Sequence, residues 1–130
     1  MTNDAPKRVL VVDDASLVRL YYRTALESAG FEVAEALNGL EALERLLGGH
    51  FDLVIVDVNM PQMDGISFLQ ALRAKSLPVS SLPAMVISSE AAPNRVAAAS
   101  AAGANFYSVK PLRAEAIVQY ASLLCGARHG

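Results

Sequence analysis

Short apolar runs alternate with amphipathic stretches along the whole chain. Three runs are continuously apolar, and each ends at a polar residue: 9–12 before Asp13, 53–56 before Asp57, and 84–87 before Ser88. Continuous apolar runs of this length predict strands of a parallel sheet that helices cover on both faces. Segments 32–36 and 105–109 are two further candidate strands, and the alternating pattern of the first indicates a strand near an edge.

Between these runs, apolar residues recur at helical spacing in five stretches. Their members are Val18, Tyr21, Tyr22, Ala25 and Ala29; Leu40, Leu43 and Leu47; Ile66, Leu69 and Leu72; the alanine-rich segment 93–102; and Ile117, Tyr120, Ala121 and Leu124. Each set predicts a helix with one face turned toward the sheet. Glycines at 30, 48–49 and 103 are suitable terminators for three of them. Strict alternation of strands and helices predicts an α/β fold, a doubly wound parallel sheet with right-handed crossovers.

Composition narrows the class of protein further. The 130 residues are 53% apolar and 18% charged, with a formal net charge of −2, which suits one globular domain and excludes disorder. Cys125 is the sole cysteine, so a disulfide scaffold is excluded. Neither a membrane-length apolar run nor a signal-peptide core is present, and we therefore expect a cytoplasmic protein. The absence of basic clusters argues against a nucleic-acid partner.

Polar residues whose side chains could take part in the chemistry of a site follow the predicted strands. Asp13 and Asp14 follow the first strand, Asp57 the third, Ser88 the fourth and Lys110 the fifth. Ligands of open α/β sheets bind outside the carboxyl ends of the strands. We therefore expect three carboxylates, one hydroxyl and one ammonium group to converge on one edge of the sheet.

Each of these residues also has a purely structural interpretation. Asp14 could cap a helix, Asp57 could belong to a turn, Ser88 could bond to a loop, and Lys110 could be solvated. Taken together, three clustered acids repel one another unless a cation lies among them, and their oxygen ligands favour Mg²⁺. The lysine and the hydroxyl could then hold a phosphoryl group, with Asp57 as the carboxylate available for nucleophilic attack.

Four blocks of sequence carry a resemblance to a known family. They are Val11-Val12-Asp13-Asp14; residues 56–61, Val-Asp-Val-Asn-Met-Pro, with Asp64-Gly65; Val86-Ile87-Ser88; and Tyr107-Ser108-Val109-Lys110-Pro111. In this order and spacing they resemble response-regulator receiver domains, the CheY-like phosphoacceptors of two-component signalling. The resemblance implies a flavodoxin-like fold with strand order 2-1-3-4-5. It covers residues 7–125 as one receiver domain, with short tails at 1–6 and 126–130.

The resemblance also implies a role for each site residue. Asp57 matches the acceptor of a phosphoryl group from a sensor histidine kinase or a phosphotransfer protein. Asp14, Asp57 and the backbone carbonyl of Asn59 match the Mg²⁺ ligands, while Asp13 matches the acid that reaches the metal through water. Lys110 matches the lysine that contacts the phosphoryl group, and its bond to the following proline is expected to be cis.

A switch is implied at two further positions. Ser88 matches the hydroxyl that responds to phosphorylation, and Tyr107 matches the aromatic residue whose rotamer follows it. Their coupling would alter the surface of the fourth helix, fifth strand and fifth helix, and so control a protein target that the sequence does not name. Ser88 replaces the commoner threonine, and Ser89 stands where alanine or glycine is usual. Asn59 and Glu90 occupy the positions that tune phosphoryl lifetime, in a pairing similar to that of chemotaxis regulators.

Other sites for phosphate chemistry lack their motifs. No P-loop and no dinucleotide-binding glycine motif is present. A phosphatase of the haloacid dehalogenase type would need an acid where Asn59 stands, and His50 and His129 lack neighbouring metal ligands. We therefore expect a monomeric signalling protein that catalyses nothing beyond its own phosphorylation and dephosphorylation. It could act alone on a target, serve as a phosphate shuttle or sink, or form part of a longer regulator or hybrid kinase; the short tail favours the first two.

Overall fold

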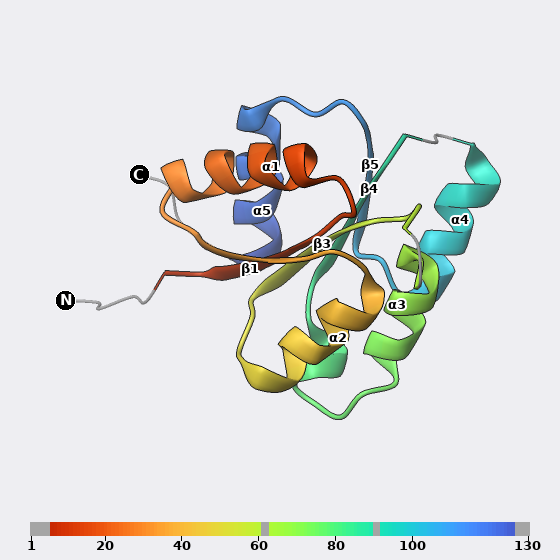
Figure 1. The fold of residues 1–130 in the computed structure, drawn as a ribbon. Helices are drawn as coiled ribbons and strands as arrows, with labels where there is room; N and C mark the ends of the chain where they lie inside the picture. The colour runs from red at the N-terminus through yellow and green to blue at the C-terminus, as the bar shows by residue number, and fades with distance from the viewer. Residues whose placement is uncertain (1–5, 61–62, 90–91, 127–130) are drawn as a thin grey trace.

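The computed structural model describes residues 6–60, 63–89 and 92–126, and within them a parallel sheet forms the centre of the molecule (Figure 1). Its strands are β1 (Arg8–Val12), β2 (Glu32–Ala36), β3 (Leu53–Asp57), β4 (Ala84–Ser88) and β5 (Phe106–Val109). They lie in the order β2-β1-β3-β4-β5, and every neighbouring pair is parallel. The predicted fold class and strand order are therefore confirmed.

Helices cover both faces of this sheet. They are α1 (Ser16–Ser28), α2 (Gly39–Gly48), α3 (Gly65–Arg73), α4 (Pro93–Ala102) and α5 (Ala114–Cys125), with a short 3₁₀ turn η1 (Val79–Ser81) before β4. The helices α1 and α5 lie on one face, and α2, α3 and α4 lie on the other (Figure 1). Alternate residues of each strand enter the two cores; on β3, Leu53 and Ile55 face α1 and α5, whereas Val54 and Val56 face the other three helices. Central strands buried on both faces explain the continuous apolar runs.

The end of α1 shows how local sequence sets an element boundary. Gly30 has a φ of 95°, a left-handed conformation that glycine adopts without the steric cost of a side chain. Its N–H donates to the carbonyl of Glu27 at 3.0 Å, and the N–H of Phe31 donates to Leu26 at 3.1 Å. This pair of bonds forms a Schellman motif, which ends the helix and directs the chain into β2.

The predicted inward face of α2 is wrong for two of its three leucines, while the third, Leu43, is partly buried and packs against the core. Leu40 and Leu47 are 48% and 79% exposed, whereas Gly39, Ala42 and Leu46 are buried. The start of the helix is closely packed, since a Cβ on Gly39 would lie 2.7 Å from Cγ of Met63. Gly39, Ala42 and Leu46 therefore face the core, and Leu40 and Leu47 are turned toward solvent.

Loops at the carboxyl ends of the strands carry the predicted site. The predicted cis bond between Lys110 and Pro111 is present, and a second cis bond joins Leu77 to Pro78.

Two residues of the predicted site lie outside the described residues: Pro61, which belongs to the motif, and Glu90, which belongs to the lifetime-tuning pair. In the described part of the chain, no helix combines the length and apolar character that crossing a membrane requires.

Candidate functional site

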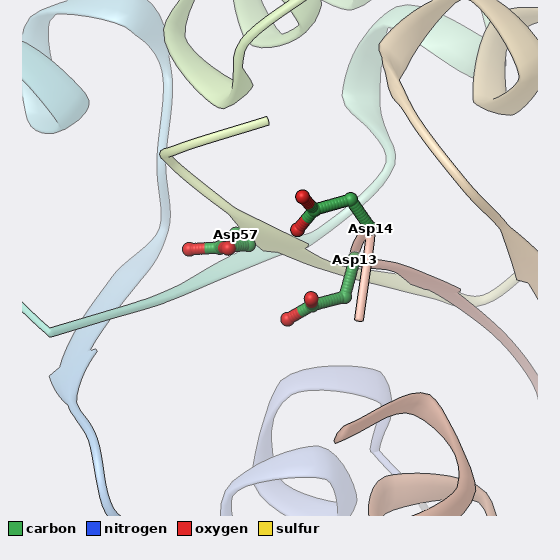
Figure 2. A group of neighbouring side chains, drawn as sticks. All are labelled: Asp13, Asp14 and Asp57. Atoms are coloured by element: carbon green, nitrogen blue, oxygen red, sulfur yellow. The ribbon is translucent and has the colours of Figure 1, made fainter. Parts of the chain in front are cut away.

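Three carboxylates gather at the carboxyl edge of the sheet (Figure 2). Asp13 and Asp14 directly follow β1, and Asp57 is the last residue of the neighbouring strand β3. Each offers an oxygen that lies within 4.8 Å of an oxygen of the other two. Asp13 and Asp57 are only 2% and 8% exposed, whereas Asp14 is open to solvent. The predicted convergence of these acids is therefore observed.

Lys110 brings one positive charge to this cluster. It directly follows β5, and its Nζ lies 3.3 Å from Oδ2 of Asp13 and 3.5 Å from Oδ2 of Asp57. The side chain is 25% exposed, so the alternative of an ordinary solvated lysine is wrong. One ammonium group does not balance three carboxylates, and the cluster keeps a surplus of negative charge.

The pKa of the Asp57 carboxyl group reflects this environment. Burial raises the pKa above its ordinary value, and the neighbouring carboxylate of Asp13 raises it further. Lys110 and the backbone N–H of Asn59, which is 3.4 Å from Oδ1 of Asp57, lower the pKa but leave the net shift upward. A cation placed beside this buried carboxylate would stabilise its charged form.

The turn between β1 and α1 is built around Asp13. The N–H of Asp13 donates to the carbonyl of Ala36 on β2 at 3.1 Å, which extends the sheet pairing beyond β1. Its Oδ1 accepts from the N–H of Ala15 at 2.9 Å. The N-cap residue of α1 is Ala15, which has no side-chain cap bond, so the interpretation of Asp14 as a helix cap is wrong.

The start of α3 lies directly against Asp57. The N–H of Gly65 donates to the carbonyl of Val58 at 2.9 Å, and a Cβ on Gly65 would lie 2.5 Å from the carbonyl oxygen of Asp57. Asp64 caps the helix by accepting from the N–H of Ser67 at 2.8 Å. The Asp64-Gly65 pair therefore fixes the end of β3, because any larger residue than glycine would collide with its backbone.

Ser88 and Tyr107 lie on the two strands beside Asp57. Ser88 ends β4, is fully buried, and its carbonyl accepts from the N–H of Lys110 at 2.7 Å. Tyr107 is half-buried on β5, opposite Val86 in the strand register, and packs against the core on the α2–α4 face. Ser88 thus joins the site edge through the backbone of Lys110, whereas Tyr107 lies two register positions before the end of β4 and packs against the core.

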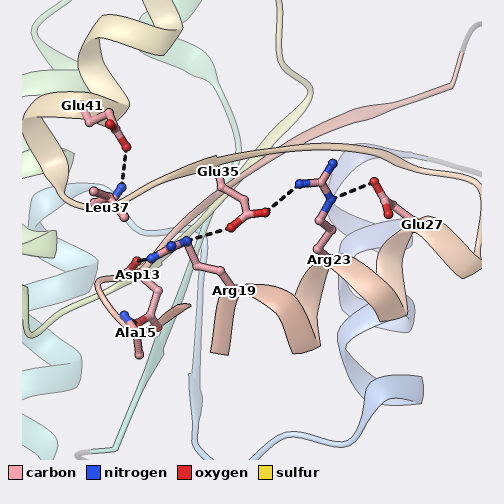
Figure 3. Close-up of polar contacts among 8 residues, drawn as sticks. All are labelled: Asp13, Ala15, Arg19, Arg23, Glu27, Glu35, Leu37 and Glu41. Atoms are coloured by element: carbon pink, nitrogen blue, oxygen red, sulfur yellow. Dashed lines mark hydrogen bonds and ion pairs between the residues drawn. The ribbon is translucent and has the colours of Figure 1, made fainter. Parts of the chain in front are cut away.

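Sequence reasoning missed one side chain that reaches this turn. Arg19 of α1 donates from Nη1 to the carbonyl of Asp13 at 2.7 Å and from Nε to Glu35 at 2.8 Å (Figure 3). A charged residue on a strand next to the core, as Glu35 is, was the one available signal that a cation lies nearby. Periodicity alone does not say which cation.

The donor set fits a hard divalent cation. Carboxylate oxygens from two adjacent chain segments lie close enough to share one ion, and one of the three acids is open to solvent. Mg²⁺ binds through one or two carboxylates and keeps water or phosphate oxygens as its other ligands, so a partly open acidic site suits it. Asp13, Asp14 and Asp57 are the residues that would hold it.

Comparisons with known proteins agree with this geometry. The response regulator receiver domain model matches residues 9–122. The chemotaxis protein CheY of Pseudomonas aeruginosa is 39% identical over 111 residues, which are 85% of this chain and 89% of that protein. The solved structure of the chemotaxis protein CheY4 of Vibrio cholerae gives a TM-score of 0.86 at 33% identity, over 92% of this chain and 99% of CheY4.

A longer relative matches equally well. The transcriptional regulatory protein PrrA of Mycobacterium tuberculosis is 40% identical over 118 residues, which are 90% of this chain but 49% of PrrA. The chain therefore spans about half the length of that relative. The receiver-domain model covers most of this chain, and the chain belongs to the response-regulator receiver domains of two-component signalling.

Proposed function

We propose that this protein accepts a phosphoryl group on Asp57, in the presence of Mg²⁺, from a histidine kinase or a phosphotransfer protein. The observation that carries the proposal is the position of Asp57. It ends the central strand, within 3.5 Å of Lys110, in a carboxylate cluster whose negative charge exceeds its positive charge. This arrangement combines a nucleophile with groups that neutralise an incoming phosphoryl group.

Asp57 is a better nucleophile in this cluster than either of its neighbours. Both oxygens of Asp13 are engaged, Oδ1 by the N–H of Ala15 and Oδ2 by Lys110. Asp14 is exposed, where water competes for its oxygens. Among contacts of the described residues, Oδ1 of Asp57 receives one long bond of 3.4 Å, from Asn59, so its lone pairs remain accessible for attack.

The transfer exchanges one bond to phosphorus for another. An oxygen of the Asp57 carboxylate attacks the phosphorus of a phosphohistidine, and the P–N bond breaks as the new O–P bond forms. The electron pair of the broken bond stays on the imidazole nitrogen, and the product on Asp57 is an acyl phosphate. Lys110 offsets charge on the phosphoryl oxygens, and Ser88 donates a hydrogen bond to one of them. Asp13, Asp14, Asp57 and the carbonyl of Asn59 would hold Mg²⁺, which would neutralise negative charge at this site.

Phosphorylation is then read at a surface. The new group adds about two negative charges beside Ser88, and the hydroxyl moves toward it. Tyr107 follows into the space near β4, which changes the surface of α4, β5 and α5 that a downstream protein contacts. Both arrangements exist beforehand, and phosphorylation shifts their populations.

Two contexts for this function are supported by specific observations. CheY of Pseudomonas aeruginosa, which this chain covers to 89%, supports a single-domain regulator in the cytoplasm that acts on a protein target. PrrA, of which the match covers 49%, supports the same domain acting as the receiver part of a longer regulator. The phosphoacceptor chemistry is the same in both contexts.

Intact mass spectrometry tests the acceptor site. After incubation with acetyl phosphate and Mg²⁺, the protein should gain a single phosphoryl group that hydroxylamine removes. The gain should vanish in Asp57→Asn and in the presence of a chelator. Asp64→Asn is the matched control, because Asp64 lies outside the carboxylate cluster and caps α3. Phosphorylation that persists in Asp57→Asn would overturn the proposal.

A further inference from the structure

We propose that Arg19 is a positioning residue for the carboxylates of Asp13 and Asp14, and thereby sets the affinity of the site for Mg²⁺. The inference rests on the proposed function, since it concerns the metal side of the same site. Arg19 touches none of the three carboxylates of the cluster in the contacts of the described residues. It acts on the backbone that carries two of them.

Arg19 joins the turn after β1 to the edge strand β2 (Figure 3). Its Nη1 donates to the carbonyl oxygen of Asp13 at 2.7 Å, and its Nε donates to Oε1 of Glu35 at 2.8 Å. The side chain is 11% exposed, so these charge-assisted bonds are shielded from competing water. One planar guanidinium thus binds two acceptors through two nitrogens at a fixed spacing, a geometry that the single nitrogen of a lysine does not reproduce.

The carbonyl that Arg19 binds belongs to the peptide bond between Asp13 and Asp14. A peptide group is planar, so fixing this oxygen also fixes the N–H of Asp14 and the directions in which both Cα atoms lie. The N–H of Asp13 is held separately by Ala36 of β2. Arg19 therefore completes the restraint on a backbone segment whose two side chains supply oxygens to the same cluster.

Glu35 holds the guanidinium of Arg19 in this position. Its second oxygen, Oε2, accepts from Nη1 of Arg23 at 2.7 Å, and Arg23 also donates to Glu27 at 3.0 Å. Burial acts to raise the pKa of Glu35, but the two arginines outweigh it and lower the pKa, so the carboxylate stays charged. Arg19 and Arg23 thus share one carboxylate, yet the contacts of the described residues connect only Arg19 to the metal site.

This asymmetry provides a matched pair of variants. Arg19→Gln and Arg23→Gln each remove one positive charge and one bond to Glu35, from the same helix. Arg19→Gln should weaken Mg²⁺ binding by about tenfold or more, the usual effect of removing a group that orients metal ligands. Arg23→Gln should bind Mg²⁺ with the affinity of the parent. Arg19→Lys, which retains the charge but places its donors on a single nitrogen, should recover part of the lost affinity.

Isothermal titration of the unphosphorylated protein with MgCl₂ measures these affinities without any dependence on phosphoryl transfer. Amide ¹⁵N chemical shifts of Asp14 and Ala15, recorded without metal, report the geometry of the turn. They should move in Arg19→Gln and stay in place in Arg23→Gln.

Equal Mg²⁺ affinities in the two glutamine variants would overturn the inference while leaving the proposed function intact. The same holds if Arg19→Lys, which preserves the charge, fully restores binding. A parent protein that does not bind Mg²⁺ would overturn the proposed function and this inference together.

Discussion

The partly buried positive charges at the amino and carboxyl edges of the sheet have opposite surroundings. At the amino edge, the guanidinium of Arg73 donates to the carbonyls of Gly103, Ser80 and Leu82 and to the side chain of Asn105, at 2.6–3.1 Å. No carboxylate is among these partners, and oxygen dipoles alone satisfy the cation. At the carboxyl edge, Lys110 faces more negative charge than it can balance.

The difference separates a cation with a structural role, Arg73, from the proposed cation-binding site at the carboxyl edge. Every bond of Arg73 ends within the fold, so this cluster has nothing left to offer a ligand and contributes to stability. At the acidic edge, in contrast, the negative charges destabilise one another unless a cation is bound among them. Removing the charge of Arg73 should therefore lower stability, whereas removing the charge of Asp57 at the carboxyl edge should raise it.

Replacing Arg73 should produce the largest loss of stability. Arg73→Met keeps the aliphatic stem but leaves the carbonyls of Gly103 and Leu82 without their charged donor. Hydrogen bonds to charged groups contribute about 1.5–3 kcal/mol, and several are lost here, so we expect the free energy of unfolding in urea to fall by about 3 kcal/mol. Lys75→Met, at an exposed neighbouring position, is the control and should change little. A loss of stability for Arg73→Met as small as that of the control would contradict the stabilising role of Arg73 at the amino edge.

Gly65→Ala should disturb the carboxyl edge by steric means. The new Cβ would lie 2.5 Å from the carbonyl oxygen of Asp57 and 2.9 Å from Cα of Val58, both rigid backbone atoms. We expect a loss of about 1–3 kcal/mol, the usual cost of overpacking, together with slower phosphorylation from acetyl phosphate.

Gly48→Ala is the control for this variant. A Cβ at Gly48 meets nothing within 4 Å, and alanine favours helix over glycine, so stability should stay the same or rise by up to about 1 kcal/mol. Phosphorylation of Gly65→Ala at the rate of the Gly48→Ala control would show that the contact with Asp57 does not set the geometry of the site.

Asp57→Asn should stabilise the metal-free protein at neutral pH, the opposite sign to Arg73→Met. The pKa of Asp57 is raised in the folded state, chiefly by burial. Between the ordinary carboxyl range and this raised pKa, the folded protein holds a proton that the unfolded chain has released, so stability falls as pH rises through that window. Above the window the full cost remains, and asparagine avoids it.

Urea unfolding as a function of pH checks this sign. The advantage of Asp57→Asn should be largest at neutral pH and disappear below the ordinary carboxyl range, where the aspartate is protonated in both states. Glu44→Gln, which removes an exposed carboxylate on α2, controls for the general loss of one negative charge. A pH-independent difference, or a less stable asparagine variant, contradicts the assigned cause.

Much of the fold could be predicted because parallel strands buried on both faces leave an unusually clear pattern. The run 84–87 differs from β4 by one residue, and 32–36 matches β2. The inward face of α2 could not be predicted in this way. Leu40, Leu43 and Leu47 have suitable spacing, but of these three Leu43 alone packs against the core, and the helix begins with a close approach of Gly39 to Met63. Such a contact between distant segments leaves no periodic signal.

The site shows the same division. Asp13, Asp14, Asp57 and Lys110 could be placed together from sequence, because the carboxyl ends of parallel strands meet at one edge. The bonds from Arg19 to Asp13 and Glu35 could not, since a long side chain reaches partners that its own helix does not specify. Arg73 was missed for the same reason, although it ties together three segments at the other edge.

Thermal unfolding across a series of Mg²⁺ concentrations tests most directly whether the surplus of negative charge at the carboxyl edge binds a cation. A cation that binds only the folded state stabilises it by an amount that grows with the logarithm of its concentration, about 2.7 kcal/mol at one hundred times the Kd. The Tm of the parent should therefore rise steadily with Mg²⁺, as should that of Arg73→Met from its lower starting point. Asp14→Asn should show little or no rise. A parent Tm that does not respond to Mg²⁺, or an equal response in Asp14→Asn, would contradict the assignment of this edge as a cation-dependent phosphoacceptor site.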